Sequence, residues 1–181
     1  IKKLNKMSHL SPFEHAAFTF SIEGVSRVLT HQLVRHRISS FSQKSQRYVF
    51  ENGFEYIVPQ RIYEADKDSN EAILAMYNER IKLEHRYYLD TVDELKAEGY
   101  DEKQAIETAR YLLPNATESK IVMSMNARSL LNFFSLRCCN RAQDEIQDLA
   151  FRILKLVKEV APTLFIKAGP YCMIHGNCNE G

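Results

Sequence analysis

The feature that most constrains the fold is a long helical pattern in the middle of the chain. Between residues 69 and 98, apolar side chains recur at intervals of three and four, which is the period of one face of an α-helix. Ser69 or Asn70 can cap its start, and Gly99 is expected to end it. The repeating apolar residues are Ile73, Met76, Tyr77, Ile81, Leu83, Tyr87, Tyr88, Val92 and Leu95.

Shorter patterns surround this helix. Apolar and polar residues alternate over 16–23, which predicts a half-buried strand ended by Gly24. The serine-rich stretch 39–45 is expected to be a loop, and 48–58 is expected to form a hairpin around Asn52-Gly53. A second β-like run covers 120–125. Further helices are predicted over residues 25–36, 101–112, 127–139 and 143–160, and Asp101 is expected to cap the second of these. Strands near the start and a helical majority after them indicate the α+β class.

The length of 181 residues suits a single domain over 1–181, in which 169–181 forms an irregular C-terminal tail. No apolar run approaches the ~20 residues that span a bilayer, and no apolar stretch follows the lysines of the first seven residues, so neither a membrane span nor a signal peptide is expected. Few cysteines and no signal favour a reduced, cytoplasmic location.

The segment 35–48 is the strongest functional signal. It reads R-H-R-I-S-S-F-S-Q-K-S-Q-R-Y and contains four fixed cations, hydroxyls and amides, but no carboxylate. Such a composition suits a phosphorylated ligand, because guanidinium groups bind phosphate through paired hydrogen bonds. Since the net charge of the chain is only +1, a small anion is favoured over a nucleic-acid track. A solvated charged surface is the alternative. Like charge from its two neighbouring arginines is expected to lower the pKa of His36.

A second cluster lies in the predicted helix 127–139. Arg128 and Asn132 are one turn apart and share a face, whereas Arg137, nine residues after Arg128, should reach a different side. Arginines beside so apolar a helix need partners, and structural ion pairs are the alternative to a ligand site.

Two other patterns have conventional explanations. Ser11 and Glu14 fit a capping box, with Pro12 in the first turn. Cys172, His175 and Cys178 match no common zinc spacing, so free thiols are favoured there and no metal is expected. Cys138 and Cys139 are expected in the core.

None of the six glycines forms a Rossmann or P-loop motif. Side chains would therefore have to hold the phosphates of any nucleotide.

Taken together, these motifs resemble the flavin-dependent thymidylate synthases, whose signature is R-H-R-x-x-S-x-[NS]-x-x-S-x-R-Y. The signature aligns with residues 35–48, and further blocks match in order: S-P-F-E-H at 11–15, Ala109-Arg110 before Leu113-Pro114, and N-A-R-S-L-x-N-F-x-x-L-R at 126–137. The resemblance covers roughly residues 8–160.

The resemblance implies an α+β fold, unlike the Rossmann fold, in which a mixed sheet packs with long helices. It implies reductive methylation of dUMP to dTMP, with methylenetetrahydrofolate as carbon donor, FAD as hydride carrier and NADPH as reductant. It also implies a homotetramer with active sites shared between subunits, and no nucleic-acid or membrane partner.

Roles for individual residues follow from motif position in the same way. The resemblance implies FAD contacts from Ser11, Arg35, His36, Arg37, Gln43, Asn126, Arg128 and Asn132. It implies dUMP contacts from Gln32, Arg35, Gln43, Lys44, Ser45, Gln46, Arg47, Arg110 and Arg137. Arg137 is the implied catalytic residue, which stabilises charge on the uracil ring. His9 and Tyr48 resemble residues near the folate entrance. No base is placed beside Ser45, so it is assigned to phosphate binding and not to nucleophilic attack.

Two other functions compete with this interpretation. A non-catalytic nucleotide- or RNA-binding module could use the basic segment, although only Phe41 and Tyr48 are available there for base stacking. A structural oligomer could use the same arginines to pair with acids.

Overall fold

The computed structural model describes residues 1–67 and 71–178. The chain divides into two compact units. Unit 1 comprises Ile1–Ile22, His31–Ser42 and Val122–Gly181, and unit 2 comprises Glu23–Thr30 and Gln43–Ile121. Both units take residues from the same three strands.

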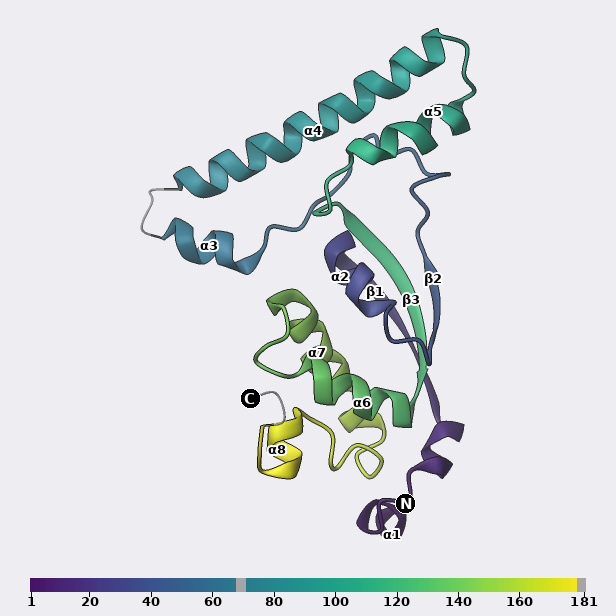
Figure 1. Cartoon of the computed structure of the whole chain (residues 1–181), viewed down its shortest axis with the longest axis vertical. Coiled ribbons are helices and arrows are strands. Elements are labelled where there is room, and N and C mark those ends of the chain that lie inside the picture. The colour runs from purple at the N-terminus through teal and green to yellow at the C-terminus, as the bar shows by residue number, and fades with distance from the viewer. Residues whose placement is uncertain (68–70, 179–181) are drawn as a thin grey trace. The chain divides into compact units, whose positions relative to one another are not determined.

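The sheet is small and antiparallel. Its strands are β1 (Ala17–Ser26), β2 (Ser40–Gln43) and β3 (Glu118–Asn126), in the order β1-β3-β2 (Figure 1). Along β3 buried and more exposed residues alternate, as the pleat of a strand requires. The predicted α+β class is confirmed, with an antiparallel sheet where a mixed one was expected.

Unit 1 is built on two helices that pack together, α6 (Ala127–Arg137) and α7 (Asp144–Val160). α7 buries one apolar stripe, which includes Ile146, Ile153 and Val157, and the buried ring of Phe165 meets Phe18 and Phe134 edge-on. The remaining elements of unit 1 are α1 (Lys2–Lys6), the 3-10 helix η1 (Ser11–His15) and α8 (Tyr171–His175). Helix α2 (Arg27–Leu33) begins in unit 2 and ends in unit 1.

Unit 2 contains the long helix, α4 (Ala72–Ala97), which packs against α3 (Gln60–Asp66) and α5 (Glu102–Ala109) (Figure 1). A short 3-10 helix, η2 (Arg110–Leu112), follows α5. The core of this unit includes Tyr88 and Val92 of α4 with Ala105 and Ala109 of α5. Asp101 forms a capping box with Gln104 at the start of α5, as its place in the sequence predicts. The suggested caps Ser69 and Asn70 lie outside the described residues.

The prediction that Gly24 ends the first strand is wrong. β1 continues through Gly24 to Ser26, and Gly24 adopts a φ of +67°, which glycine tolerates without a Cβ penalty. The backbone N–H of Gly24 donates to Glu118 Oε1 at 2.9 Å. The glycine therefore marks an irregularity within the strand, and the helix expected from residue 25 begins at Arg27 and ends at Leu33.

The predicted loop and hairpin after α2 are also wrong. Residues 40–43 form β2, with the backbone N–H of Lys44 donating to Lys120 O at 2.9 Å, because pairing with β3 outweighs the weak strand propensity of serine. The pieces around Asn52-Gly53 do not pair with each other. Tyr56 forms an isolated bridge with Thr117 instead.

At the C-terminus, α8 occupies part of the segment expected to be irregular. Among the described residues, none of the helices has the length and apolar character that crossing a bilayer requires.

Candidate active site

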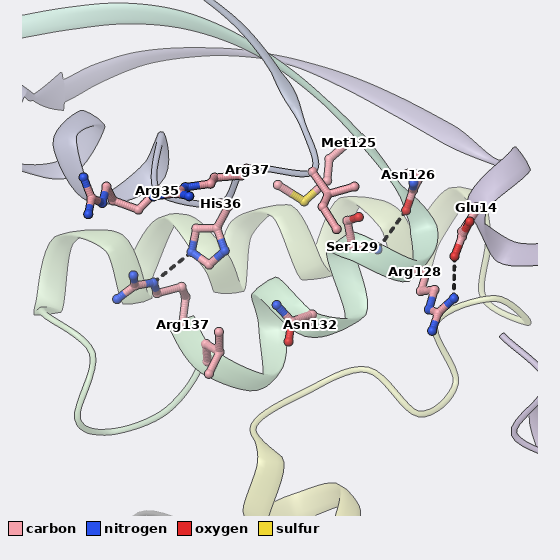
Figure 2. Close-up of a pocket in the computed structure, with 12 residues that line it drawn as sticks. Glu14, Arg35, His36, Arg37, Met125, Asn126, Arg128, Ser129, Asn132 and Arg137 are labelled. Atoms are coloured by element: carbon pink, nitrogen blue, oxygen red, sulfur yellow. Dashed lines mark hydrogen bonds and ion pairs between the residues drawn. The ribbon is translucent and has the colours of Figure 1, made fainter. Parts of the chain in front are cut away.

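The candidate site is a pocket of about 820 Å³ within unit 1 (Figure 2). Four arginines line it, Arg35, Arg37, Arg128 and Arg137, and Glu14 is the one carboxylate among its described lining residues. The rest of the lining consists of His36, Ile38, Met125, Asn126, Ser129, Asn132 and Leu136. The excess of guanidinium groups makes this a site for an anionic ligand.

The first turns of α6 supply much of this lining. Asn126 caps the helix, because its Oδ1 accepts the backbone N–H of Ser129 at 2.8 Å. Leu130, Phe133 and Phe134 are fully buried and fix the opposite side of α6 in the core of unit 1. The helix therefore presents its polar residues on a rigid support. Arg128 and Arg137 both line this pocket, although they are nine residues apart on α6 and were expected on different sides of it.

Arg128 and Glu14 form an ion pair, in which the guanidinium Nη1 contacts Glu14 Oε1 (Figure 2). The predicted capping box is therefore wrong. The N-cap of η1 is Leu10, which makes no side-chain cap, and Glu14 reaches α6 instead of its own helix terminus. Both side chains are about half exposed, so the pair is weak and open to rearrangement.

Arg137 and His36 make the second contact in the pocket. Arg137 Nε donates to His36 Nε2 at 3.1 Å (Figure 2). Burial, and secondly the charge of Arg137, lowers the pKa of His36 to about 4. The predicted direction is confirmed, but the cause is burial and a distant arginine rather than the two neighbours in sequence.

Arg35 and Arg37 are exposed at the pocket. Within residues 1–67 and 71–178, neither guanidinium has a carboxylate or hydrogen-bond partner. Both remain available to a ligand.

The predicted FAD-contact residues come together only in part. Arg35, His36, Arg37, Asn126, Arg128 and Asn132 all line the pocket, together with Arg137. Ser11 does not line it, and Gln43 lies in unit 2. Gln32, predicted to contact dUMP, lies in unit 1, where its side-chain amide donates to the amide oxygen of Gln143.

Most of the other predicted dUMP-contact residues lie in unit 2. Gln43 Nε2 donates to the hydroxyls of Thr30 and Ser119, at 3.0 and 2.8 Å. Lys44 Nζ lies 2.9 Å from each carboxylate oxygen of Glu51, which is 5 % exposed. Both polar side chains are thus already engaged within the unit.

Arg47 is likewise paired. Its Nε and Nη2 donate to Glu107 Oε2 at 3.1 and 2.8 Å, and this contact raises the pKa of Arg47 and lowers that of Glu107. The ring of Tyr48 lies beneath Arg47 and Lys103. Arg110 lies close enough to Arg27 to lower the pKa of Arg27, secondarily to burial.

Five pocket residues were not predicted as site residues: Glu14, Ile38, Met125, Ser129 and Leu136. Ser129 lies three residues before Asn132 and Leu136 lies four residues after it, so helical spacing could have identified both as neighbours of a predicted site residue. Ile38 directly follows the arginine motif. Glu14 and Met125 depend on tertiary contacts that the sequence does not signal.

The cysteines have no role in this pocket. Cys138 is buried, as predicted, whereas Cys139 is only partly buried. Burial raises the pKa of the Cys138 thiol to about 11, so this thiol is unreactive at neutral pH. Cys172 and Cys178 are exposed and free. In the part of the chain that the structure describes, His, Cys, Asp and Glu side chains form no group that could hold a metal ion.

Comparison with known proteins decides the family. The model of the family described as "Thymidylate synthase complementing protein" matches residues 1–163. The chain belongs to this family. Similar members carry the name "Flavin-dependent thymidylate synthase". The relative from Clostridium tetani (strain Massachusetts / E88) is 51 % identical over 100 % of this chain and 74 % of its own length. The relative from Geobacter sulfurreducens is 45 % identical over 100 % of this chain and 73 % of its own length. The relative from Pyrococcus abyssi is 43 % identical over 95 % of this chain and 68 % of its own length. The family predicted from the arginine motif is therefore confirmed.

Proposed function

We propose that this chain catalyses the reductive methylation of dUMP to dTMP, using the pocket of unit 1 to hold FAD. The single observation that carries the proposal is the coincidence of the family match over residues 1–163 with a pocket lined by four arginines. Methylenetetrahydrofolate is the carbon donor and NADPH the reductant in this family's reaction.

The donor set of the pocket fits a flavin dinucleotide. FAD carries a diphosphate, and guanidinium groups bind phosphate oxygens in pairs. Arg35 and Arg37 have no competing partner among the described residues, and Asn132 adds an amide. The volume of about 820 Å³ lies within the range of about 300–1,000 Å³ typical of ligand pockets. When bound and reduced, FAD supplies the hydride that the methylation consumes.

Arg137 is proposed as the catalytic residue. Uracil becomes nucleophilic at its ring carbon when negative charge develops on its imide, and a fixed guanidinium stabilises that charge. Its Nε is held by His36, which leaves the terminal amino groups as the donors. No covalent nucleophile is needed, and the buried thiol of Cys138 supplies none.

The substrate-binding role of unit 2 is a further part of the proposal. Arg47 and Arg110 are proposed to bind the phosphate of dUMP, with Ser45 and the amide of Gln46 completing the cradle. Since Arg47 is paired with Glu107, the substrate phosphate must share or displace that carboxylate. Gln43 retains its carbonyl oxygen for a ligand, because its amide nitrogen serves Thr30 and Ser119. We place Ser11 beside FAD, Gln32 and Lys44 beside dUMP, and His9 and Tyr48 near the folate, by motif position alone.

We also propose a homotetramer in the cytoplasm, with active sites shared between subunits. Large apolar side chains exposed on α7, such as Phe151, Leu156 and Val160, are 45, 52 and 74 % exposed and would be covered by another subunit. Mixing inactive Arg137→Ala and Arg47→Ala proteins should restore activity if each site takes these arginines from different subunits. An active monomer would refute the sharing.

The reaction itself is tested by assay. Purified protein should bind FAD and, with dUMP and methylenetetrahydrofolate, should oxidise NADPH and form dTMP. Flavin-independent binding of single-stranded RNA with a steep salt dependence, and no dTMP, would support the nucleic-acid module instead.

A further inference from the structure

The backbone of His36 is fixed on both sides. Its N–H donates to Leu33 O at 3.1 Å, and the hydroxyl of Ser39 donates to its carbonyl oxygen. Leu33 is fully buried at the end of α2. The short segment after this helix therefore holds the imidazole in a defined place.

The imidazole ring is also fixed by packing. It meets the ring of Phe133 edge-on, with centroids 5.0 Å apart and an interplanar angle of 80°. Phe133 is fully buried, and it lies one helical turn before Arg137 on α6. One face of α6 thus carries both the ring of Phe133, against which His36 packs, and the guanidinium that His36 contacts.

The contact between the two side chains fixes the proton positions. Arginine has only donors, so the Nε–H of Arg137 needs an unprotonated nitrogen at His36 Nε2, and Nδ1 must carry the imidazole hydrogen. Around the imidazole, Arg35 and Arg37 lie on its own segment, Arg128 and Arg137 on α6, and Glu14 on η1 is paired with Arg128. This positive environment favours the neutral ring at neutral pH.

We propose that His36 is a positioning residue for Arg137, whose guanidinium it orients by accepting the Nε–H at its own Nε2. That Arg137 acts on uracil rests on the proposed function, whereas the orienting contact stands on the geometry alone. Nη1 and Nη2 of Arg137 have no partner among the described residues. With Nε held, the plane of the guanidinium and the positions of its two terminal amino groups are restricted, and the ligand need not bear the entropy of ordering a long side chain.

Two substitutions separate this role from simple packing. His36→Phe keeps an aromatic ring against Phe133 but removes the acceptor. His36→Gln has an amide oxygen that can reach roughly the position of Nε2, although it lacks the ring. If His36 orients Arg137, His36→Phe should lower kcat by ~10- to 100-fold, the range for a hydrogen bond to a charged group, and His36→Gln should recover much of that loss. If the ring serves packing alone, the order reverses, and the proposal is wrong.

A double-mutant cycle tests whether the effect passes through Arg137. In Arg137→Ala protein, adding His36→Phe should lower kcat by less than twofold more, because the residue that His36 orients is already absent. Equal losses in both backgrounds would contradict the proposal. Bound FAD absorbance, recorded for every variant, shows whether a loss arises from the cofactor instead.

A readout independent of activity distinguishes failure of this inference from failure of the proposed function. In ¹⁵N NMR spectra of the full chain, His36 should be the Nδ1–H tautomer, and the Nε–H of Arg137 should be protected from exchange in wild-type protein and His36→Gln but not in His36→Phe. These signals are expected even if no dTMP forms. An Nε2–H tautomer, or an unprotected Arg137 Nε–H in wild-type protein, would overturn the inference.

Discussion

The cations of the two units differ in what they already contact. In unit 1, Arg35 and Arg37 meet no acid among the described residues, and Arg137 meets only a neutral imidazole. In unit 2, Lys44 is bound to Glu51 and Arg47 to Glu107. Apart from Arg137, both groups lie within the fourteen residues of the sequence motif, but the fold makes one group available to a ligand and commits the other to protein contacts.

Because of this difference, the cations of the two units should contribute differently to ligand binding. A cation without a partner contributes its full charge to a ligand, whereas a paired one must first give up a hydrogen bond to its carboxylate. Substitutions in unit 1 should therefore affect ligands first, and those in unit 2 should also affect stability.

The largest effect is expected at Arg137. Arg137→Ala should lower dTMP formation by ~100- to 1,000-fold at saturating dUMP, the cost of removing one donor aimed at developing charge, while leaving the thermal midpoint nearly unchanged. Arg152→Ala is the matched control, because the Arg152 side chain is 75 % exposed and, among the described residues, pairs only with Asp148 on its own helix. If Arg137→Ala instead unfolds the protein, the arginine is structural, as expected for a structural oligomer whose arginines pair with acids.

A stability effect is expected in unit 2. Glu51→Gln should lower the free energy of unfolding by ~2 kcal/mol, because a buried carboxylate that pairs with Lys44 is replaced by a neutral amide. Urea denaturation measures the change, with the exposed Glu84→Gln as control. An unchanged midpoint for Glu51→Gln would mean that Lys44 is as free as the arginines of unit 1.

The Arg47–Glu107 pair tests whether a committed cation still binds substrate. Arg47→Ala should weaken dUMP binding by ~10-fold or more, with FAD binding retained. Glu107→Gln should change dUMP affinity by less than ~10-fold and in the tighter direction, because an exposed pair contributes little. Calorimetric titration with dUMP measures both. Weaker binding in Glu107→Gln would show that the carboxylate orients Arg47 rather than competing for it.

The smallest effect concerns pH. The pKa of His36 falls from 6.5 to about 4 on folding. Between pH 4 and 6.5 the imidazole is therefore mostly protonated in the unfolded chain and mostly neutral in the folded chain. Its contribution to stability is therefore present above pH 6.5 and is lost as pH falls toward 4, and partial exposure of the ring keeps the loss small. Comparing wild-type protein with His36→Phe in urea at several pH values isolates this slope. Parallel pH curves for the two proteins would contradict the burial of a neutral imidazole.

Much of the fold could be predicted from the sequence, because local signals were strong. The three-and-four period located α4, and Asp101 located the start of α5. β2 and the isolated bridge at Tyr56 could not be predicted, since they exist through pairing with β3 and with Thr117. Strand formation of this kind depends on a partner that local propensity does not reveal.

For the site, the sequence predicted which residues take part but not which side chains they contact. Motif spacing identified the arginines and amides of the pocket. It did not reveal that Glu14 would pair with Arg128, that Arg137 would contact His36, or that Glu107 would occupy Arg47. These contacts join residues 60 to 114 positions apart, and only the folded chain brings them together.

The most direct test of the central claim is equilibrium FAD binding, followed by flavin fluorescence, for two double variants. Arg35→Ala/Arg37→Ala removes two cations of the unit 1 pocket that have no acidic partner among the described residues, and Arg47→Ala/Arg110→Ala removes cations of unit 2. The first should weaken FAD binding by ~100-fold or more, because each of the two substitutions removes one hydrogen-bonded contact to a charged group. The second should leave FAD affinity within ~3-fold of wild type. Equal losses, or a larger loss in the second variant, would contradict the assignment of the flavin to the pocket of unit 1.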